Sequence, residues 1–260
     1  MKKVLLVLVT CLLAACLTAC QGKGTDASVT EEAKPVLKMA TEATFQPYEY
    51  YDGDKIVGID VEIVAAIAEK IGYDFEVIDT EFDTLIPGVQ SGKYDLSAAG
   101  MTVTEERLEQ VNFSDSYATG IQVVIVNEDS EITSVDDLFD GKIADLLVGT
   151  QAGTTGFLYA TWDIADEGLG TVNDYKKTTD AAQALVNGQI DCVLLDNEPA
   201  KAIVANNEGL KILDTAYAEE AYAIALAKEN TELLNVMNNA LKELIADGTV
   251  NKIVTKYIGK

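Results

Sequence analysis

The chain has 260 residues, with 19 lysines and arginines against 43 aspartates and glutamates, and it contains no histidine. The lack of histidine excludes Ser-His-Asp and Cys-His nucleophile systems and removes the commonest zinc ligand. The formal net charge of −24 argues against nucleic acid as a partner, because nucleic-acid binding needs a basic surface.

The first residues predict export. Lys2 and Lys3 precede an apolar run at 4–15, which is typical of a secretory signal and too short for a membrane span. We therefore expect residues 1–19 to be a signal peptide. Removing them leaves 17 basic and 43 acidic residues, a net charge of about −26.

The signal ends in Leu17-Thr18-Ala19-Cys20, which resembles a bacterial lipobox whose cysteine is acylated. Cys16 ends a second segment that fits the same pattern, and an ordinary signal peptide with idle cysteines is the alternative. We favour Cys20 because it leaves the fuller apolar segment. Residues 20–32 are small and polar without periodicity, and we expect them to be a lipid-anchored tether.

One cysteine, Cys192, lies beyond Cys20, so no disulfide can form within the folded part. Its stability must come from apolar cores. Roughly 225 residues are enough for two domains of ordinary size or for one large domain.

Strand and helix signals alternate along the first half of the chain. The patterns predict a strand at 36–41, a hairpin turn at 50–55, a helix that begins at Asp60 and ends at Gly72, and a strand at 75–78. Asp83 is expected to cap a helix that ends at Gly92, before a buried strand at 96–101. Residues 111–117 then lead to a strand at 121–126.

The second half continues this alternation. A short capped helix is expected at 134–140, a strand at 146–150 and the start of a helix at 153–156. Further elements are expected at 171–175, 181–186, 191–195, 199–205 and 222–227, with closing helices at 232–246 and 250–258. The order predicts parallel-rich sheets covered by helices, an α/β fold.

Polar or glycine-containing clusters lie at or just beyond the carboxyl ends of four predicted strands: Thr41-Glu42, Gly100-Met101-Thr102, Gly153-Thr154-Thr155 and Asp196. Ligands bind at the carboxyl ends of strands in such sheets, so we expect the ligand site there. The segment 153–156 lacks the lysine of a phosphate loop, and Asp52-Gly53-Asp54 lacks the further acids of a calcium loop. We expect no metal site and no cofactor.

Seven segments, in order, resemble the amino-acid-binding proteins of bacterial ABC importers, called solute-binding family 3. They are residues 43–50 (ATFQPYEY), 58–62, 82–87, 100–107 (GMTVTEER), 111–114, 151–156 (QAGTTG) and 191–196. This resemblance covers essentially all of the mature chain. It implies a two-lobed periplasmic-binding-protein fold of type II with a hinge of two crossing strands. The implied lobes are 33–118 with 223–260, and 119–222.

The resemblance implies how both charges of an amino acid are held. Burying either charge unpaired is costly, so the site needs a cation and an anion. Arg107, the only arginine, matches the residue that grips the α-carboxylate, and its planar fork suits that group. The amides and hydroxyls of Thr154 and Thr155 are implied to take the same carboxylate.

The α-ammonium is implied to lie against Asp196, the Gly100 carbonyl and the Thr102 hydroxyl. Each ionic residue has an alternative role. Arg107 could form a solvated salt bridge with Glu105, Glu106 or Glu109, and Asp196 could cap the following helix.

The ligand side chain is implied to lie between Phe45 and Phe82, with Tyr48 as a weaker candidate; core packing is the alternative. Glu42 and Gln151 match positions typical of binders of basic amino acids, whereas Leu195 is apolar where some relatives are polar. We therefore expect arginine or lysine, otherwise glutamine, cystine or another polar amino acid. The predicted site is completed by neighbours of these residues, Ala99, Met101 and Gly153.

The expected function is that of a substrate-binding lipoprotein. It closes around one free amino acid and delivers it to the permease of an ABC transporter, as a monomer anchored on the outer face of the cell membrane. The acidic surface either steers cationic solutes or maintains solubility. The alternatives are an exported dehydratase-like enzyme, with Glu42 or Asp196 as acid or base, and a ligand-sensing surface protein.

Overall fold

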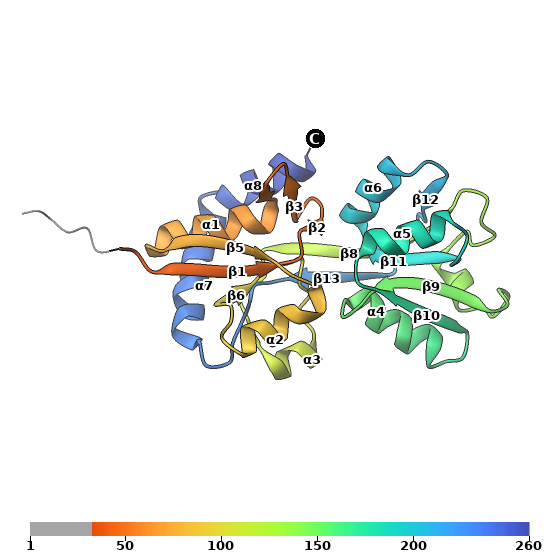
Figure 1. Cartoon of the computed structure of the whole chain (residues 1–260), viewed down its shortest axis with the longest axis horizontal. Coiled ribbons are helices and arrows are strands. Elements are labelled where there is room, and N and C mark those ends of the chain that lie inside the picture. Colours follow the sequence, from red (N-terminus) through yellow and green to blue (C-terminus); the bar gives the residue numbers. More distant parts are fainter. Residues whose placement is uncertain (1–32, 260) are drawn as a thin grey trace, which may run out of the picture. The chain divides into compact units, whose positions relative to one another are not determined.

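Two mixed β-sheets organise the part of the chain that the computed structural model describes, residues 33–259 (Figure 1). The expected signal peptide, Cys20 and the tether lie outside these residues. No helix within 33–259 is long and apolar enough to cross a bilayer.

The first sheet has the strand order β5-β1-β6-β14-β7. Its strands are β1 (Val36–Thr41), β5 (Asp74–Asp79), β6 (Leu96–Ser97), β7 (Asn112–Phe113) and β14 (Ala225–Leu226). Strand β1 runs parallel to β5 and β6, whereas β14 is antiparallel to β6 and β7. A small antiparallel sheet beside it consists of β2 (Thr44–Phe45), β3 (Glu49–Asp52) and β4 (Lys55–Val57).

Helices cover both faces of the first sheet, because side chains alternate along β1. Leu37 and Met39 belong to a core cluster shared with α1 (Ile59–Ile71), α7 (Thr231–Ala246) and α8 (Thr249–Ile258). On the other face, Ala40 packs with Leu85 of α2 (Leu85–Gln90), which follows the 3₁₀ turn η1 (Phe82–Thr84). The short helix α3 (Glu105–Gln110) precedes β7.

The second sheet has the order β10-β9-β11-β8-β12, and β13 pairs with β8. Its strands are β8 (Ala118–Asn127), β9 (Leu146–Gln151), β10 (Gly170–Tyr175), β11 (Cys192–Asp196), β12 (Leu210–Ile212) and β13 (Ala218–Tyr222). Every residue of β11 is buried, because α4 (Thr155–Ala160) with the π-helical turn η3 (Thr161–Ala165) covers one face, and α5 (Thr178–Val186) with α6 (Asn197–Asn206) covers the other. A 3₁₀ turn, η2 (Val135–Leu138), lies between β8 and β9.

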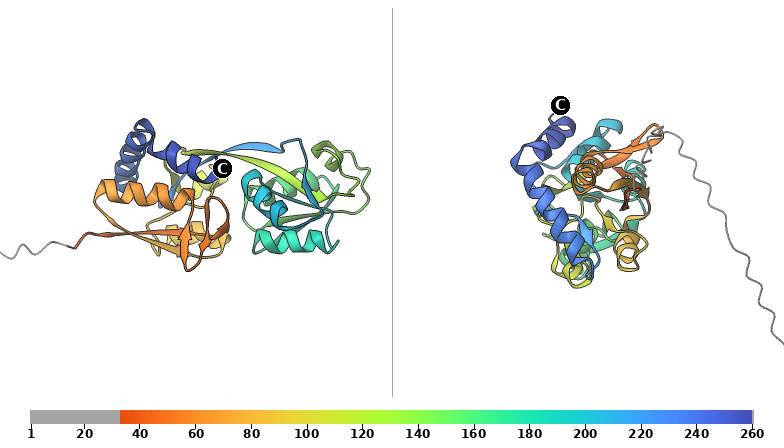
Figure 2. Two further views of the ribbon diagram at one scale, coloured as in Figure 1. Left: turned by 90° about the horizontal axis from the view of Figure 1, so that it is seen from above. Right: turned by 90° about the vertical axis from the view of Figure 1, so that its left-hand side faces the viewer.

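Two adjacent strands connect the sheets (Figure 2). The chain leaves the first sheet after β7, enters the second along β8, and returns along β13 to β14. Strands β8 and β13 pair antiparallel, with Ala118 opposite Tyr222 and Gln122 opposite Ala218. The two-lobed α/β fold is therefore confirmed. We call the first sheet with its helices lobe 1 and the second lobe 2; the lobe limits at 118/119 and 222/223 stay a prediction.

Several expected element bounds are wrong. The strand expected at 96–101 ends at Ser97, because Gly100 at φ +52° turns the chain out of the sheet. The strand expected at 222–227 is divided, since residues 223–224 leave the ladder between β13 and β14. Asp83 lies inside η1, and the positions before η1 and α2 are Glu81 and Thr84, so Asp83 is the cap of neither. Asp60 is the second residue of α1 and is buried, whereas Gly58 precedes the helix.

Candidate functional site

A cavity of about 20 Å³ lies between the lobes, at the ends of β6, β9 and β11. A cavity of this size holds about one water molecule, so the lobes must separate before an amino acid can enter. All of its lining residues belong to the predicted site: Phe45, Phe82, Ala99, Gly100, Thr102, Arg107, Gln151, Thr154, Thr155 and Asp196.

Arg107 is buried and joins the two lobes. The Thr104 hydroxyl caps α3 by accepting a hydrogen bond from the Arg107 backbone N–H at 3.1 Å. The guanidinium donates through Nη1 to the Thr102 carbonyl at 2.8 Å and through Nη2 to the Gly153 carbonyl at 2.9 Å. Its Cζ lies 5.5 Å from the centroid of the Phe82 ring, within the range of a cation–π contact.

The alternative role of Arg107 in a solvated salt bridge is wrong. Its exposed fraction is 5%, and no ion pair within residues 33–259 involves it. Burial lowers the pKa of Arg107 to about 10, which still leaves the guanidinium charged at neutral pH. The site therefore contains a fixed, partly desolvated cation.

Thr154 has a structural task in lobe 2. Its hydroxyl donates to the Gln151 carbonyl at 2.7 Å and accepts from the Phe157 backbone N–H at 3.3 Å, which caps α4. A hydroxyl has one proton, so in this arrangement Thr154 has none left for a carboxylate. Thr155 also lines the cavity, and among residues 33–259 its hydroxyl is not part of this cap.

Two carboxylates lie together on the lobe 2 side. The Gln122 amide nitrogen Nε2 donates to Asp196 Oδ2 at 2.7 Å and to Glu220 Oε2 at 3.0 Å. Thr102 Oγ1 donates to the same Glu220 oxygen at 2.9 Å. The remaining oxygens, Asp196 Oδ1 and Glu220 Oε1, are buried and have no hydrogen-bond partner within residues 33–259.

The carboxylate of Asp196 does not cap α6, although Asp196 occupies the position before that helix. Burial, and then the charge of Glu220, raise the pKa of Asp196 well above its usual range. The charge of Arg107 opposes this rise, but within residues 33–259 no positively charged group is hydrogen-bonded to the free oxygen, Asp196 Oδ1. A ligand ammonium would supply that charge.

Gly100 owes its position to Asp60. The Gly100 N–H donates to Asp60 Oδ2 at 2.8 Å, and the Tyr117 hydroxyl donates to the same oxygen at 2.7 Å. A Cβ on Gly100 would lie 2.7 Å from the Phe45 ring, and its φ of +52° is a region that other residues rarely adopt. Glycine is therefore required both by the turn and by the aromatic wall.

The aromatic wall of lobe 1 is two layers deep. Phe45 lines the cavity, and its ring centroid lies 5.9 Å from that of Tyr48. Tyr48 in turn packs edge-on against Tyr222 at 5.2 Å. Tyr48 therefore supports Phe45 from behind and does not line the cavity. Met101 does not line it either, because its side chain packs in the core with α2.

Glu42 is buried beside the cavity at the end of β1. Both of its carboxylate oxygens accept from the Thr44 hydroxyl, at 2.7 and 2.8 Å. Burial raises the pKa of Glu42, and hydrogen bonds from Thr44 and the Gln151 amide oppose the rise. Gln151 is held in place by the Thr178 hydroxyl, which donates to its Oε1 at 2.8 Å.

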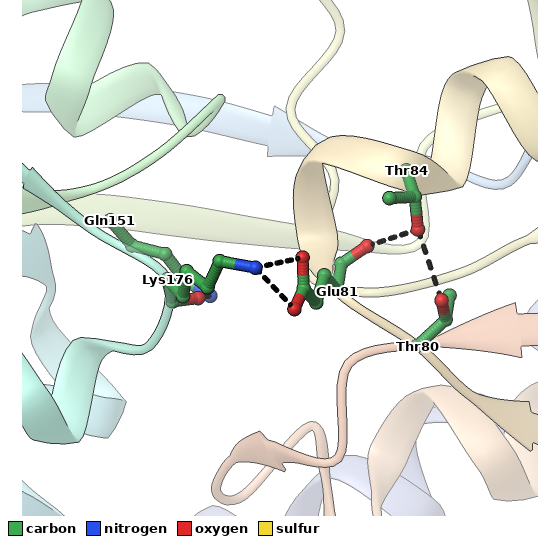
Figure 3. Close-up of polar contacts among 5 residues, drawn as sticks. All are labelled: Thr80, Glu81, Thr84, Gln151 and Lys176. Atoms are coloured by element: carbon green, nitrogen blue, oxygen red, sulfur yellow. Dashed lines mark hydrogen bonds and ion pairs between the residues drawn. The ribbon is translucent and has the colours of Figure 1, made fainter.

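An ion pair that the sequence did not indicate spans the lobes at the rim (Figure 3). Lys176 Nζ donates to both carboxylate oxygens of Glu81, at 2.8 and 3.0 Å. The backbone carbonyl of Lys176 accepts from Gln151 Nε2 at 3.0 Å, so the pair is connected to the cavity wall. On the lobe 1 side, the Thr84 hydroxyl donates to the Glu81 carbonyl at 2.7 Å.

Gly153 contributes its carbonyl to Arg107 and lines a second cavity of about 220 Å³, which shares Phe82 and Arg107 with the first. The sequence interpretation missed three buried polar residues of the site: Asp60, Gln122 and Glu220. For Glu220, strand alternation was an available signal, since it shares a buried face with Tyr222 while Glu219 is exposed.

Comparisons with known proteins agree with this geometry. A family model described as "Bacterial extracellular solute-binding proteins, family 3" matches residues 37–260. The arginine-binding extracellular protein ArtP of Bacillus subtilis (strain 168) is 35% identical over 259 residues, covering 99% of this chain and 98% of that protein.

Two solved structures are similar over most of the chain. An ancestral arginine-binding protein bound to arginine has a TM-score of 0.80 and 39% identity, covering 86% of this chain and 99% of the other. An ancestral amino-acid-binding protein, AncCDT-1, described as a precursor of cyclohexadienyl dehydratase, has a TM-score of 0.77 and 31% identity, covering 85% and 95%.

Proposed function

Because the chain belongs to family 3 of the bacterial extracellular solute-binding proteins, and so serves amino-acid import by an ABC transporter, we propose that its ligand is a cationic amino acid, arginine or lysine. In this proposal the amino acid lies in the cavity between Arg107 and Asp196. The lobes close on it, and the permease of the importer receives it.

One observation carries the proposal: a buried guanidinium from lobe 1 and a buried carboxylate from lobe 2 line the same small cavity. An amino acid has an α-carboxylate that can bind the guanidinium and an α-ammonium that can bind the carboxylate. Arg107 would exchange its bond to the Gly153 carbonyl for the α-carboxylate, and Thr155 would assist. Asp196, the Gly100 carbonyl and the Thr102 hydroxyl would take the α-ammonium.

The charge of the ligand follows from the surplus of acids. Among residues 33–259, Arg107 is the one cation that lines the cavity, whereas Asp196 lines it and Glu42 and Glu220 are buried beside it. A zwitterion would leave this surplus uncompensated, and a cationic side chain between Phe45 and Phe82 would reduce it. Glutamine and cystine, which lack the extra charge, are the alternatives.

Closure follows from the connection of the lobes. Only the paired strands β8 and β13 carry the chain between the sheets, and a ligand that touches both lobes favours the closed form. Small-angle scattering with and without ligand measures this change. Superimposable profiles would contradict the closing mechanism.

The experiment that tests the ligand is a thermal-shift screen across the twenty amino acids, ornithine, citrulline and cystine. A ligand at about 100 times its Kd raises the free energy of unfolding by about 2.7 kcal/mol. We expect the largest shifts with arginine and lysine, and no shift with the Arg107→Ala variant. A largest shift with a neutral amino acid would refute the charge argument.

A second candidate function is suggested by the similarity to AncCDT-1, a binding protein described as a dehydratase precursor. The raised pKa of Asp196 is a property that a general acid also needs. The presence of both a guanidinium, Arg107, and a carboxylate, Asp196, in one cavity favours the binding of an amino acid over catalysis. Incubation with cyclic hydroxy acids, followed by chromatography, distinguishes the two, because only an enzyme depletes the acid.

We also propose that the protein is exported as a monomer and anchored to the membrane through acylated Cys20. The extracellular family supports export, and the lipobox-like segment supports the anchor. Cys20→Ala should release the protein into the medium, whereas Cys16→Ala should leave it in the membrane fraction. The opposite result would make Cys16 the acylated residue.

A further inference from the structure

Glu220 is a buried acid that does not itself line the ligand cavity. It lies on β13 with 5% of its surface exposed, and its carboxylate contacts the Thr102 hydroxyl and the Gln122 amide. The remaining oxygen has no hydrogen-bond partner within residues 33–259. Burying such a group is costly, so its contacts need an explanation other than packing.

The contact with Thr102 determines what that hydroxyl can do. A threonine hydroxyl has one proton and two acceptor sites. At 2.9 Å, Thr102 Oγ1 donates to Glu220 Oε2, the oxygen that also accepts from the Gln122 amide. The proton therefore points away from the cavity that Thr102 lines, and a lone pair of the oxygen is left for a ligand.

The Gln122 amide is oriented in the same way. Its Nε2 has two protons, and these go to Asp196 at 2.7 Å and Glu220 at 3.0 Å. Around Glu220 the other charged or titratable groups are Asp196, Arg107 and the Tyr159 hydroxyl. Burial and the charge of Glu220 raise the pKa of Tyr159 to about 12.

We propose that Glu220 is a positioning residue for the ligand ammonium: it holds Thr102 as a hydrogen-bond acceptor and so makes this end of the site accept N–H donors only. The inference rests on the proposed function, since it assumes an α-amino ligand at Asp196. The ammonium's three protons would go to Asp196, the Gly100 carbonyl and Thr102 Oγ1. A ligand with an oxygen acceptor at that point would face lone pairs on every side.

The test is a double-mutant cycle on the full protein, with calorimetric Kd values for L-arginine or for whichever amino acid gives the largest thermal shift. Glu220→Gln keeps the shape of the side chain but lets it donate, and we expect its affinity to fall on the order of tenfold to a hundredfold. In a Thr102→Val background, Glu220→Gln should lower the affinity by less than about threefold, because the hydroxyl through which Glu220 acts is absent.

The control is Glu219→Gln, the exposed neighbour on the other face of β13, which should leave Kd unchanged. The inference would be overturned if Glu220→Gln changed Kd by the same factor in the wild-type and Thr102→Val backgrounds, or if it changed Kd in neither. If Glu220→Gln fails to fold, two Thr102 variants replace it in the test. Thr102→Ser keeps the hydroxyl and should bind the amino acid nearly as tightly as the wild type, whereas Thr102→Val lacks the hydroxyl and should bind it more weakly. Equal affinities of these two variants would overturn the inference. If the wild-type protein binds no amino acid, the proposed function itself fails.

Discussion

Arg107 of lobe 1 donates to the backbone carbonyl of Gly153 in lobe 2 over 2.9 Å, so the residue expected to hold the ligand carboxylate also joins the lobes. The guanidinium is not exposed to solvent but donates hydrogen bonds to a carbonyl on each lobe, that of Thr102 and that of Gly153. Binding a carboxylate would therefore exchange a hydrogen bond to a neutral carbonyl for one to an anion, which the planar guanidinium can hold with two parallel N–H groups.

The charge of Glu42 should select the ligand side chain. We expect Glu42→Gln to weaken arginine binding about tenfold or more and glutamine binding by much less, because only the cationic ligand loses an ionic partner. Calorimetric Kd values for both ligands measure the ratio. Glu76→Gln removes an exposed acid from lobe 1 and should leave the ratio unchanged; equal losses for both ligands with Glu42→Gln would contradict the assignment.

Gly100→Ala should impair binding beyond its effect on folding. A Cβ there would lie 2.7 Å from the Phe45 ring, so we expect at least a tenfold loss of affinity. Gly92→Ala is the matched control, since its φ is +71° and nothing lies within 4 Å of its Cβ. It should lose about 1–2 kcal/mol in urea unfolding and bind ligand normally. Equal affinities of the two variants would exclude steric control by Phe45.

The buried carboxyl of Asp60 should make stability depend on pH. Burial raises the pKa of Asp60 from 3.8 to about 6, so the native state holds this proton more tightly than the unfolded chain. The resulting stabilisation is full below about pH 4 and is lost as the pH rises through about 6.

Asp60→Asn removes this titration and keeps an acceptor for Gly100 and Tyr117. Relative to the wild type, the variant should gain free energy of unfolding as the pH rises from about 4 to 6, as measured by urea denaturation. Asp54→Asn, on the exposed hairpin, controls for the loss of one charge. A constant difference between Asp60→Asn and wild type across this window would disprove the linkage.

The pair between Glu81 and Lys176 should contribute little and should depend on salt. Both side chains are largely exposed, at 46% and 73%, and such pairs contribute about 0–1 kcal/mol. We expect Lys176→Gln to weaken ligand binding at most about fivefold at low ionic strength, and not at all at about 1 M salt. Lys142→Gln, which breaks an exposed pair within lobe 2, should have no effect on Kd. A loss that persists at high salt would point to a direct role in the site.

The two charged residues of the cavity, Arg107 and Asp196, were predictable from the sequence. Arginine is scarce in this chain, and the aspartate stands at the end of a predicted strand. A single arginine and an aspartate at the end of an apolar run are conspicuous in the sequence, and Arg107 and Asp196 do line one cavity. Helix periodicity similarly located α1, α7 and α8. These signals are local in the sequence, so they can be recognised without knowledge of the fold.

The roles of the supporting residues were not predictable, because these roles depend on contacts distant in sequence. Asp60 stands in the first turn of a helix, where an acid is ordinarily explained by the helix dipole, yet its partners are Gly100 and Tyr117. Alternation along the five-residue strand β13 places Glu220 on the same face as Tyr222, but it does not show which residues that face meets. Only the pairing of β13 with β8 directs one of those acids inward.

Strand β14 lies between β6 and β7 in the first sheet, although more than a hundred residues of lobe 2 precede it in the chain. Lobe 2 can therefore acquire its sheet from one continuous stretch, while lobe 1 keeps two unpaired strand edges until the last segment arrives. We expect lobe 2 to fold first and lobe 1 to be completed by insertion of β14. A chain that ends before Ala225 would keep lobe 2 intact and lose the other half of the ligand site.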